Sequence, residues 1–170
     1  AVMARSLTGS DFAAVFAGDP YKPGSDNGHF NGAAGIDTDA KGRVYVVDSS
    51  NNRIQIFSPD GTYLKTIKID RPHLVLVHKK TGAIYVTHQG RVRGKSVGRV
   101  TKLESFENPK EVFHFDGLMG MIALDSWSKK PRLWSCGAPY GRSYLSKGYS
   151  GPAHLTVWEE QGKTFKKVAD

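Results

Sequence analysis

Short runs of apolar residues, each of strand length, alternate with polar turn residues in the first part of the chain. The segment GIDTDAKGRVYVVDSSNNRIQIFSPDGTYLKTIKI, residues 35–69, has turn-forming residues at 39–42, 49–52 and 58–61. This spacing predicts four strands joined by three tight turns, which is a four-stranded antiparallel meander. The second strand, Val44–Val47, is apolar on both faces, as is typical of a sheet covered on both sides by neighbouring sheets.

The same unit recurs twice along the chain. In LVLVHKKTGAIYVTH, Leu76 takes the place of Ile36 and Gly82 that of Gly42, forty residues further on. A weaker third copy, MIALDSWSKKPRLWSCG, is followed by a long internal loop and two predicted closing strands at 154–158 and 164–168. A repeat of about 40–50 residues with four short strands is typical of a β-propeller blade, whereas the amphipathic helices of a helical solenoid are not predicted.

The first copy carries the residues of a known repeat family. They are Gly-Ile-Asp at 35–37, Gly-Arg-Val-Tyr-Val-Val-Asp-Ser at 42–49, Asn52–Phe57 and Asp60-Gly61. This set closely resembles the NHL repeat, and the resemblance implies a propeller of six blades. The second and third copies keep the strand spacing, with the glycine turn in the second, but lack the Asp-Ser-x-Asn-x-Arg piece.

The predicted fold class is therefore all-β, a β-propeller segment of four-stranded antiparallel blades. Residues 1–170 form one segment, with blades at 30–70, 71–116 and 117–170 and a remnant of a preceding blade at 11–18. Three blades and a stray strand do not close a ring, so their end sheets would expose apolar faces to water. We expect the missing blades to come from further sequence or from a second copy of the chain.

Composition is that of one ordinary globular domain, but the charge is unevenly placed. The 170 residues are 39% hydrophobic and 24% charged. No apolar run approaches the roughly 18 residues of a membrane-spanning helix, and a single cysteine, Cys136, excludes an internal disulfide. The net charge of +8 arises after residue 72, where sixteen Lys and Arg face eight acidic residues. This asymmetry either favours an anionic partner or serves solubility, and it leaves the cellular compartment open.

Two loops, each connecting the second strand of a blade to the third, carry the candidate binding residues. Residues 91–99 hold four basic side chains and no acid, and residues 138–150 hold three tyrosines interleaved with two basic side chains. Because the two connections are equivalent, we expect them to lie side by side on one rim. The predicted ligand-binding rim consists of Arg91, Arg93, Lys95, Arg99, Tyr140, Arg142, Tyr144, Lys147 and Tyr149.

The chemistry of this rim suits an anionic polymer such as RNA or an acidic glycan. Basic groups neutralise phosphate, sulfate or carboxylate, and tyrosine faces stack on bases or sugar rings. The resemblance adds that some NHL propellers bind RNA through a basic face. Two alternatives remain open: the tyrosines pack against their own blade, or the rim docks a protein.

The remaining candidates divide into structural residues and one metal ligand. Asp48, Asn52 and Arg53 lie in the best-matched motif, where Asp accepts backbone hydrogens in a turn and Arg pairs with a carboxylate or carbonyl. His73 precedes an innermost strand, at a position that resembles the channel-facing histidine of NHL-like lyases that hold zinc. The equivalent residues of the other copies, Ala33 and Met121, are not ligands, and a catalytic zinc needs about three.

The sequence therefore favours a non-catalytic binding module that contacts a protein or an anionic polymer through one loop rim. No catalytic residues and no cofactor are predicted. The alternative is an NHL-like lyase or lactonase-type propeller with Zn or Ca in the central channel and His73 among the ligands.

Overall fold

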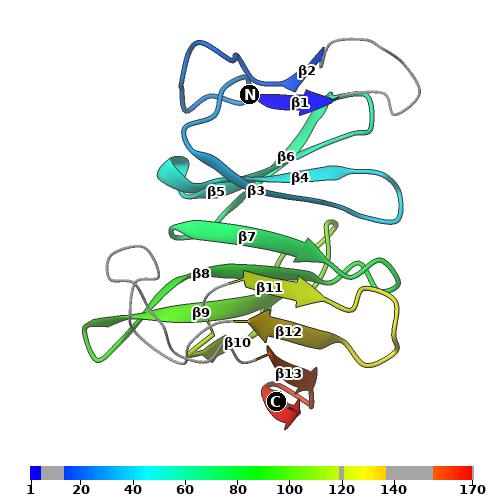
Figure 1. Ribbon diagram of the computed structural model, residues 1–170. Helices are drawn as coiled ribbons and strands as arrows, with labels where there is room; N and C mark the ends of the chain where they lie inside the picture. The colour runs from blue at the N-terminus through cyan, green and yellow to red at the C-terminus, as the bar shows by residue number, and fades with distance from the viewer. Residues whose placement is uncertain (5–13, 119–120, 137–154, 170) are drawn as a thin grey trace. The chain divides into compact units, whose positions relative to one another are not determined.

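The computed structural model describes residues 1–4, 14–118, 121–136 and 155–169 (Figure 1). In these ranges the chain forms strands and turns, with one short 3-10 helix at Ser49–Asn51. None of the described segments is a helix long and apolar enough to cross a membrane. The strands make three four-stranded antiparallel sheets and one two-stranded sheet, which confirms the predicted all-β class with propeller blades. The chain divides into two compact units, residues 1–75 and 76–170.

The first unit contains the sheet predicted from residues 35–69. Its strands pair in sequence order: β3 (Ala33–Thr38), β4 (Val44–Asp48), β5 (Arg53–Phe57) and β6 (Tyr63–Lys68). A separate two-stranded sheet is formed by β1 (Val2–Ala4) and β2 (Ala14–Ala17). In the four-stranded sheet, the polar residues between the strands therefore form the turns of the predicted meander.

The pairing register places polar and aromatic residues on one face of the first sheet. Asp48 lies opposite Arg53, which lies opposite Lys68 on the next strand. Residues opposite each other in antiparallel strands point to the same face, and every second residue along β5 joins them. At the end of this face, the Phe57 ring lies 5.8 Å from that of Phe30, centroid to centroid. This apolar contact holds the segment before β3 against the sheet.

The other two four-stranded sheets lie in the second unit, except for residues 72–75 at the start of the first of these sheets. The sheet of residues 72–116 begins at the division between the units, with β7 (Pro72–Val77), β8 (Ile84–Val92), β9 (Lys95–Leu103) and β10 (Glu111–Asp116). The other sheet consists of β11 (Met121–Leu124), β12 (Arg132–Cys136), β13 (Leu155–Glu160) and β14 (Phe165–Ala169). The last two lie within two residues of the predicted closing strands.

The two sheets of the second unit share an apolar core. Tyr85 and Phe113 from the first of them pack with Leu133 and Phe165 from the second in one buried cluster. The Phe165 ring lies 6.0 Å from Tyr85 and 5.7 Å from Phe113, centroid to centroid. The Tyr85 hydroxyl also donates a hydrogen bond of 2.6 Å to Glu160 Oε2. This packing of sheet faces is what adjacent propeller blades require.

A glycine turn recurs between the first and second strands of two sheets. Gly42 has φ 76° and Gly82 has φ 75°, a left-handed conformation that glycine adopts without steric cost. In the first sheet the Asp39 carboxylate adds bonds to the backbone N–H groups of Lys41 and Arg43, at 2.9 and 3.0 Å. The alignment of these two glycines in the sequence therefore reflects the same backbone requirement.

The segment 91–99 is a strand hairpin and not the loop that the sequence predicted. β8 and β9 pair without interruption from Ile84 opposite Leu103 to Val92 opposite Lys95. The turn consists of two residues, Arg93 and Gly94, with φ 48° and 77°. Positive φ at both central residues is the signature of a type I′ turn, whose twist suits a long hairpin. The basic residues therefore stand on paired strands with a fixed register.

Candidate functional site

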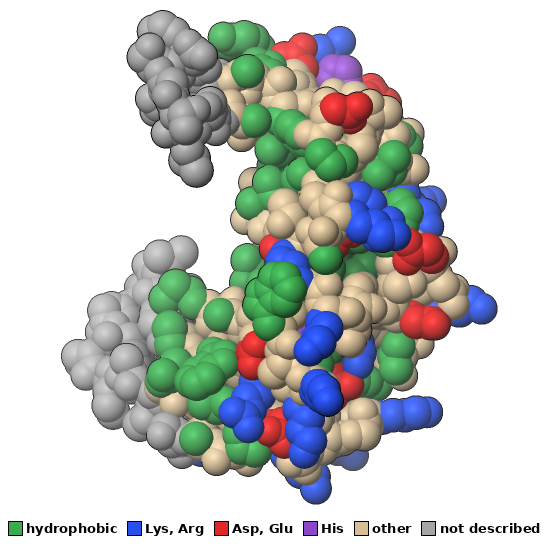
Figure 2. Space-filling model, turned by 90° about the vertical axis from the view of Figure 1, so that its right-hand side faces the viewer, with side chains coloured by type: hydrophobic (Ala, Val, Ile, Leu, Met, Phe, Trp, Pro, Cys, Tyr) green, Lys and Arg blue, Asp and Glu red, His purple; other side chains and the backbone are tan. Residues whose placement is uncertain are grey.

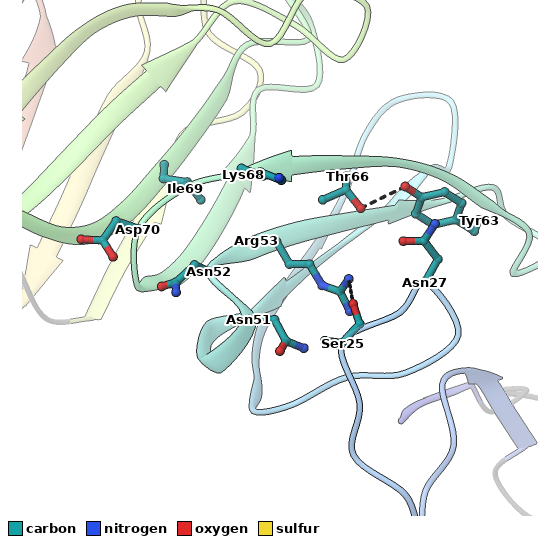
Figure 3. Close-up of a pocket in the computed structure, with 10 residues that line it drawn as sticks. All are labelled: Ser25, Asn27, Asn51, Asn52, Arg53, Tyr63, Thr66, Lys68, Ile69 and Asp70. Atoms are coloured by element: carbon teal, nitrogen blue, oxygen red, sulfur yellow. Dashed lines mark hydrogen bonds between the residues drawn. The ribbon is translucent and has the colours of Figure 1, made fainter.

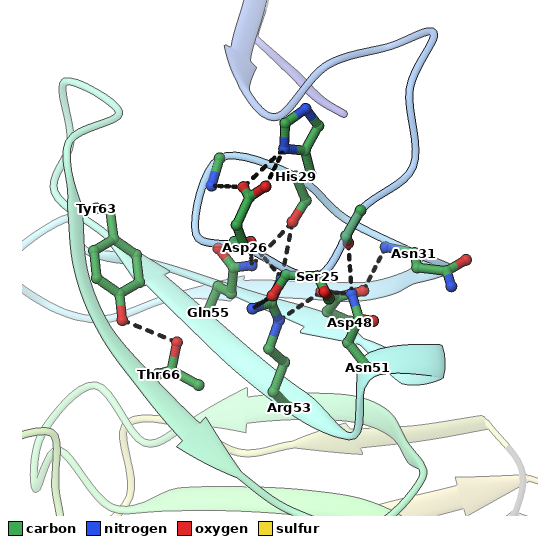
Figure 4. A network of polar contacts seen from close by, with 12 residues as sticks. Ser25, Asp26, His29, Asn31, Asp48, Asn51, Arg53, Gln55, Tyr63 and Thr66 are labelled. Atoms are coloured by element: carbon green, nitrogen blue, oxygen red, sulfur yellow. Dashed lines mark hydrogen bonds and ion pairs between the residues drawn. The ribbon is translucent and has the colours of Figure 1, made fainter.

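The connection between β4 and β5 in the first unit is built around Asp48 and Arg53 (Figure 4). Asp48 is fully buried, and its Oδ2 accepts a hydrogen bond of 2.7 Å from Arg53 Nε. Its carboxylate also accepts bonds from the Asn31 backbone N–H at 2.7 Å and from Asn51 Nδ2 at 2.8 Å. The buried carboxylate therefore accepts three hydrogen bonds from protein groups.

The other nitrogens of Arg53 bind the loop of residues 24–31. Arg53 NH1 donates to the carbonyl of Ser25 at 2.6 Å, and NH2 donates to the carbonyls of Asp26 and His29 at 2.8 and 2.9 Å. Gln55, two residues further along β5, donates a bond of 3.1 Å to the same His29 carbonyl. The guanidinium therefore connects the buried carboxylate to a loop that lies outside the strands.

Asn52 fixes the other side of this connection. It has φ 52° and ψ 48°, a left-handed conformation that asparagine tolerates better than most residues. Its side-chain Oδ1 accepts a bond of 2.9 Å from the backbone N–H of Arg71, and its carbonyl accepts one of 3.1 Å from Ile69. Together with Asp48 and Arg53 it stabilises the turn and its neighbouring segments.

An open pocket of about 750 Å³ lies beside this network, between the 24–31 loop and β6 (Figure 3). Its wall includes Asn27 from the loop, Arg53 from β5, and Tyr63 and Lys68 from β6. The Tyr63 hydroxyl forms a hydrogen bond of 2.9 Å with Thr66 Oγ1. The described wall holds no His or Cys and one carboxylate, Asp70. The pocket can donate and accept hydrogen bonds, but its wall does not supply a nucleophile with an adjacent base.

Three of the predicted rim cations lie free at the tip of the β8–β9 hairpin. Arg91, Arg93 and Lys95 are exposed, and none of them forms an ion pair with a described acidic residue. Figure 2 shows one face of the molecule, on which Lys and Arg side chains are interspersed with Asp and Glu. The hairpin tip differs from such a mixed surface because its cations are not compensated locally.

The fourth cation, Arg99, is neutralised. Its Nε and NH2 donate to the two oxygens of Asp116 at 2.6 and 3.0 Å, a two-pronged pair. These bonds from Arg99 hold the pKa of Asp116 below its usual value. Gly90 leaves room for the guanidinium, because a Cβ at this position would lie 2.6 Å from Arg99 Nε. Arg99 therefore adds little to the net charge of the hairpin tip.

The rest of the predicted rim lies outside the described residues. Tyr140, Arg142, Tyr144, Lys147 and Tyr149 belong to residues 137–154, so their position beside the hairpin stays a prediction. His73 lies on β7, where its side chain is exposed. In the described ranges no three His, Cys, Asp or Glu side chains come close enough together to hold a metal ion. The described part of the chain thus gives His73 no partner ligands.

Two residues of these sites were not anticipated from the sequence. Asp116 pairs with Arg99 because the two residues lie opposite each other on β10 and β9. Gln55 is fully buried on β5, and its Oε1 has no hydrogen-bond partner among the described residues. A glutamine among apolar residues was the available sequence signal for Gln55. Asp116 could be found only from the register of two strands.

Comparison with known proteins finds a family match over the first three strands of the first sheet. Residues 30–57 match the NHL repeat family. Protein lin-41 of Caenorhabditis elegans is 49% identical over 43 residues, which is 25% of this chain and 4% of that protein. The match therefore covers a small part of the relative. The Asp48–Arg53 connection lies inside the matched residues, and the β8–β9 hairpin lies outside the family match.

Proposed function

We propose that this chain, which carries an NHL repeat and is built of β-propeller blades, is a non-catalytic interaction module that binds an anionic polymer through the tip of the β8–β9 hairpin. The observation that carries the proposal is the group of three exposed cations, Arg91, Arg93 and Lys95, with no ion-pair partner in the described chain. Uncompensated surface charge attracts a polyanion and displaces its condensed counterions.

The geometry of the hairpin supports an electrostatic contact with a flexible polymer. Arg91 lies opposite Ser96, whereas Lys95 lies opposite Val92, so the two cations point to opposite faces of the hairpin. Arg93 occupies the turn between them. Charge on both faces of a narrow hairpin suits contacts to a phosphate or sulfate backbone, which carry little sequence information. RNA and acidic glycans both offer such a backbone.

The test measures binding of single-stranded RNA and of heparin at several salt concentrations. Three phosphate contacts on a single strand predict a slope of about −2 for log K against log salt. The charge-neutral variant Arg91→Gln/Arg93→Asn/Lys95→Gln should bring this slope close to zero. Asn-Gly is the preferred pair for a type I′ turn, so the Arg93 substitution keeps the hairpin.

A matched control removes three lysines elsewhere in the second unit. Lys163→Gln/Lys166→Gln/Lys167→Gln lowers the net charge by the same amount and leaves the hairpin intact. The control should keep the slope of the unmodified chain. An equal loss of binding in both variants would contradict a site at the hairpin, and no binding of either polymer at low salt would contradict the proposal as a whole.

A further inference from the structure

A tryptophan is exposed on the turn between β11 and β12, at the other end of the second unit's sheets. The side chain of Trp127 is 68% exposed, and in the described chain its ring makes no aromatic contact and its indole N–H no hydrogen bond. Trp158, by contrast, is packed into the structure: its indole N–H donates to Ser135 Oγ at 3.0 Å, and its ring lies 5.4 Å from that of Phe115, centroid to centroid. The Trp127 side chain thus contributes little to folding.

The backbone that carries Trp127 is nevertheless held in place. Asp125 Oδ1 accepts bonds from the N–H groups of Trp127 and Ser128, both at 3.2 Å. The Asp125 N–H donates to the Arg132 carbonyl at 2.9 Å, which closes the turn. His78 Nε2 lies 3.0 Å from the Ser128 carbonyl and donates to it. The turn is therefore fixed while its largest side chain remains free.

Three lysines lie on the same turn as this tryptophan or on the neighbouring turn. Lys129 and Lys130 follow it on the same turn, and the bond from His78 brings the β7–β8 turn, with Lys80, alongside. All three are exposed and form no ion pair with a described residue.

The acidic groups near these lysines are already engaged. Glu160 binds Tyr85 and Lys102, and Glu159 binds Arg132 at 2.9 Å. Asp125 accepts the N–H groups of its own turn. Lys130 attracts the Glu159 carboxylate, but none of the three lysines forms an ion pair with a described acidic residue, so a net positive charge remains beside the apolar ring.

We propose that Trp127, Lys80, Lys129 and Lys130, which we name the Trp127 rim, dock an acidic peptide segment of a partner protein. Trp127 packs on an apolar side chain of that segment, and the lysines bind its carboxylates. Tryptophan on a fixed backbone is the typical anchor of a protein interface, because little conformational entropy is lost when it binds. The charge complementarity selects an acidic partner.

The same residues fit other anionic partners less well. A membrane anchor needs several inserted apolar groups or a lipid chain besides its basic residues, and here Ser126 and Ser128 flank the single tryptophan. Single-stranded nucleic acid is bound by successive stacking platforms, and this turn offers one.

The Trp127 rim is separate from the β8–β9 hairpin tip. The β7–β8 turn precedes Ile84 and the hairpin tip follows Val92, so they lie at opposite ends of β8. A strand of nine residues spans about 30 Å. The two surfaces can therefore be tested by separate variants.

The experiment measures fluorescence anisotropy of a labelled, Glu-rich synthetic peptide with a central Phe-Leu pair, mixed with the full chain at low salt. We expect saturable binding that weakens at least about tenfold in Trp127→Ala. Lys129→Gln/Lys130→Gln should weaken binding several-fold and reduce its salt dependence. The hairpin variant Arg91→Gln/Arg93→Asn/Lys95→Gln should keep the part of the peptide binding that depends on Trp127.

Three results would overturn the proposal. The first is equally tight binding of a matched peptide with Ser-Ser in place of Phe-Leu, because charge alone would then explain the contact. The second is unchanged binding in Trp127→Ala, which should fold normally because the ring is exposed. The third is a Trp127-dependent binding of phosphatidylserine vesicles or oligouridine that exceeds binding of the peptide, which would assign this surface to another partner.

Discussion

Replacing Arg53 by methionine tests whether the NHL connection depends on the buried ion pair. The variant keeps an unbranched apolar side chain in place of the arginine stem but removes the guanidinium and its four hydrogen bonds: one to Asp48 and three to the carbonyls of the 24–31 loop. Asp48 would keep the Asn31 N–H and Asn51 Nδ2 as donors. Its carboxylate would then be buried without a cation.

The expected cost follows from the burial of the two groups. Arg53 and Asp48 side chains are 8% and 0% exposed, so water does not replace the lost donor. Removing one partner of such a buried pair costs about 3–5 kcal/mol. Loss of the hydrogen bonds to the loop carbonyls adds less to this cost, because Ser25 and Asp26 are exposed and their carbonyls can bind water instead. The total is a large part of the free energy of unfolding of a typical domain, which is about 5–15 kcal/mol.

Urea denaturation of Arg53→Met measures the loss of stability, and amide hydrogen exchange locates it. Exchange should rise first at residues 24–32, where the Asn31 N–H binds Asp48 directly. The control is Arg71→Met, because Arg71 and Asp70 form an exposed pair at 3.4 Å, and such pairs contribute about 0–1 kcal/mol.

Asp48→Asn in the Arg53→Met background removes the unpaired charge and should recover part of the stability. This double variant keeps the test informative if Arg53→Met itself does not fold. A loss below about 1 kcal/mol in Arg53→Met, with unchanged exchange in the loop, would refute the assigned role of the ion pair.

Two further predictions concern the second unit. Burial lowers the pKa of His78 below 6.5, so the unfolded chain binds a proton at a higher pH than the folded chain does. The contribution of neutral His78 to the free energy of unfolding is therefore fully present above that pH, and it falls as the pH drops, by up to about 1.4 kcal/mol per pH unit. Urea titrations should show this slope reduced in His78→Gln. Gly94 has φ 77° with free space around its Cβ position, so thermal unfolding should show Gly94→Ala to be destabilised by about 1–2 kcal/mol through backbone strain alone.

The first sheet could be predicted closely because its signals are local. Each of its turns is marked by polar or glycine residues within a few positions, and the glycine turn repeats at Gly42 and Gly82. The all-β class and the blade arrangement follow from this regular punctuation. The hairpin of residues 91–99 was wrongly expected to be a loop, because its basic residues interrupt the apolar pattern of β8 and β9. Gly94 after Arg93 was the remaining turn signal.

The contacts of the sites could not be predicted because they depend on register and on backbone atoms. Arg99 meets Asp116 only in the pairing that follows the irregularity between Glu111 and Phe113. A one-residue slip would place their side chains on opposite faces. Arg53 binds carbonyls of residues 25, 26 and 29, and every residue carries a carbonyl, so the amino-acid types there give no signal.

The repeated scaffold and the proposed binding residues are carried by different parts of the chain. In the first sheet, the connection between the second and third strands is the short turn of residues 49–52. Its side chains form hydrogen bonds with the turn itself and with the segment that follows the sheet. In the next sheet, the same connection is a hairpin whose tip leaves three cations unused. A side chain engaged in a buried network cannot bind a partner without loss of stability, whereas a free exposed one can. The matched NHL residues therefore account for most of the first sheet, and the binding that we propose depends on residues where the sheets differ.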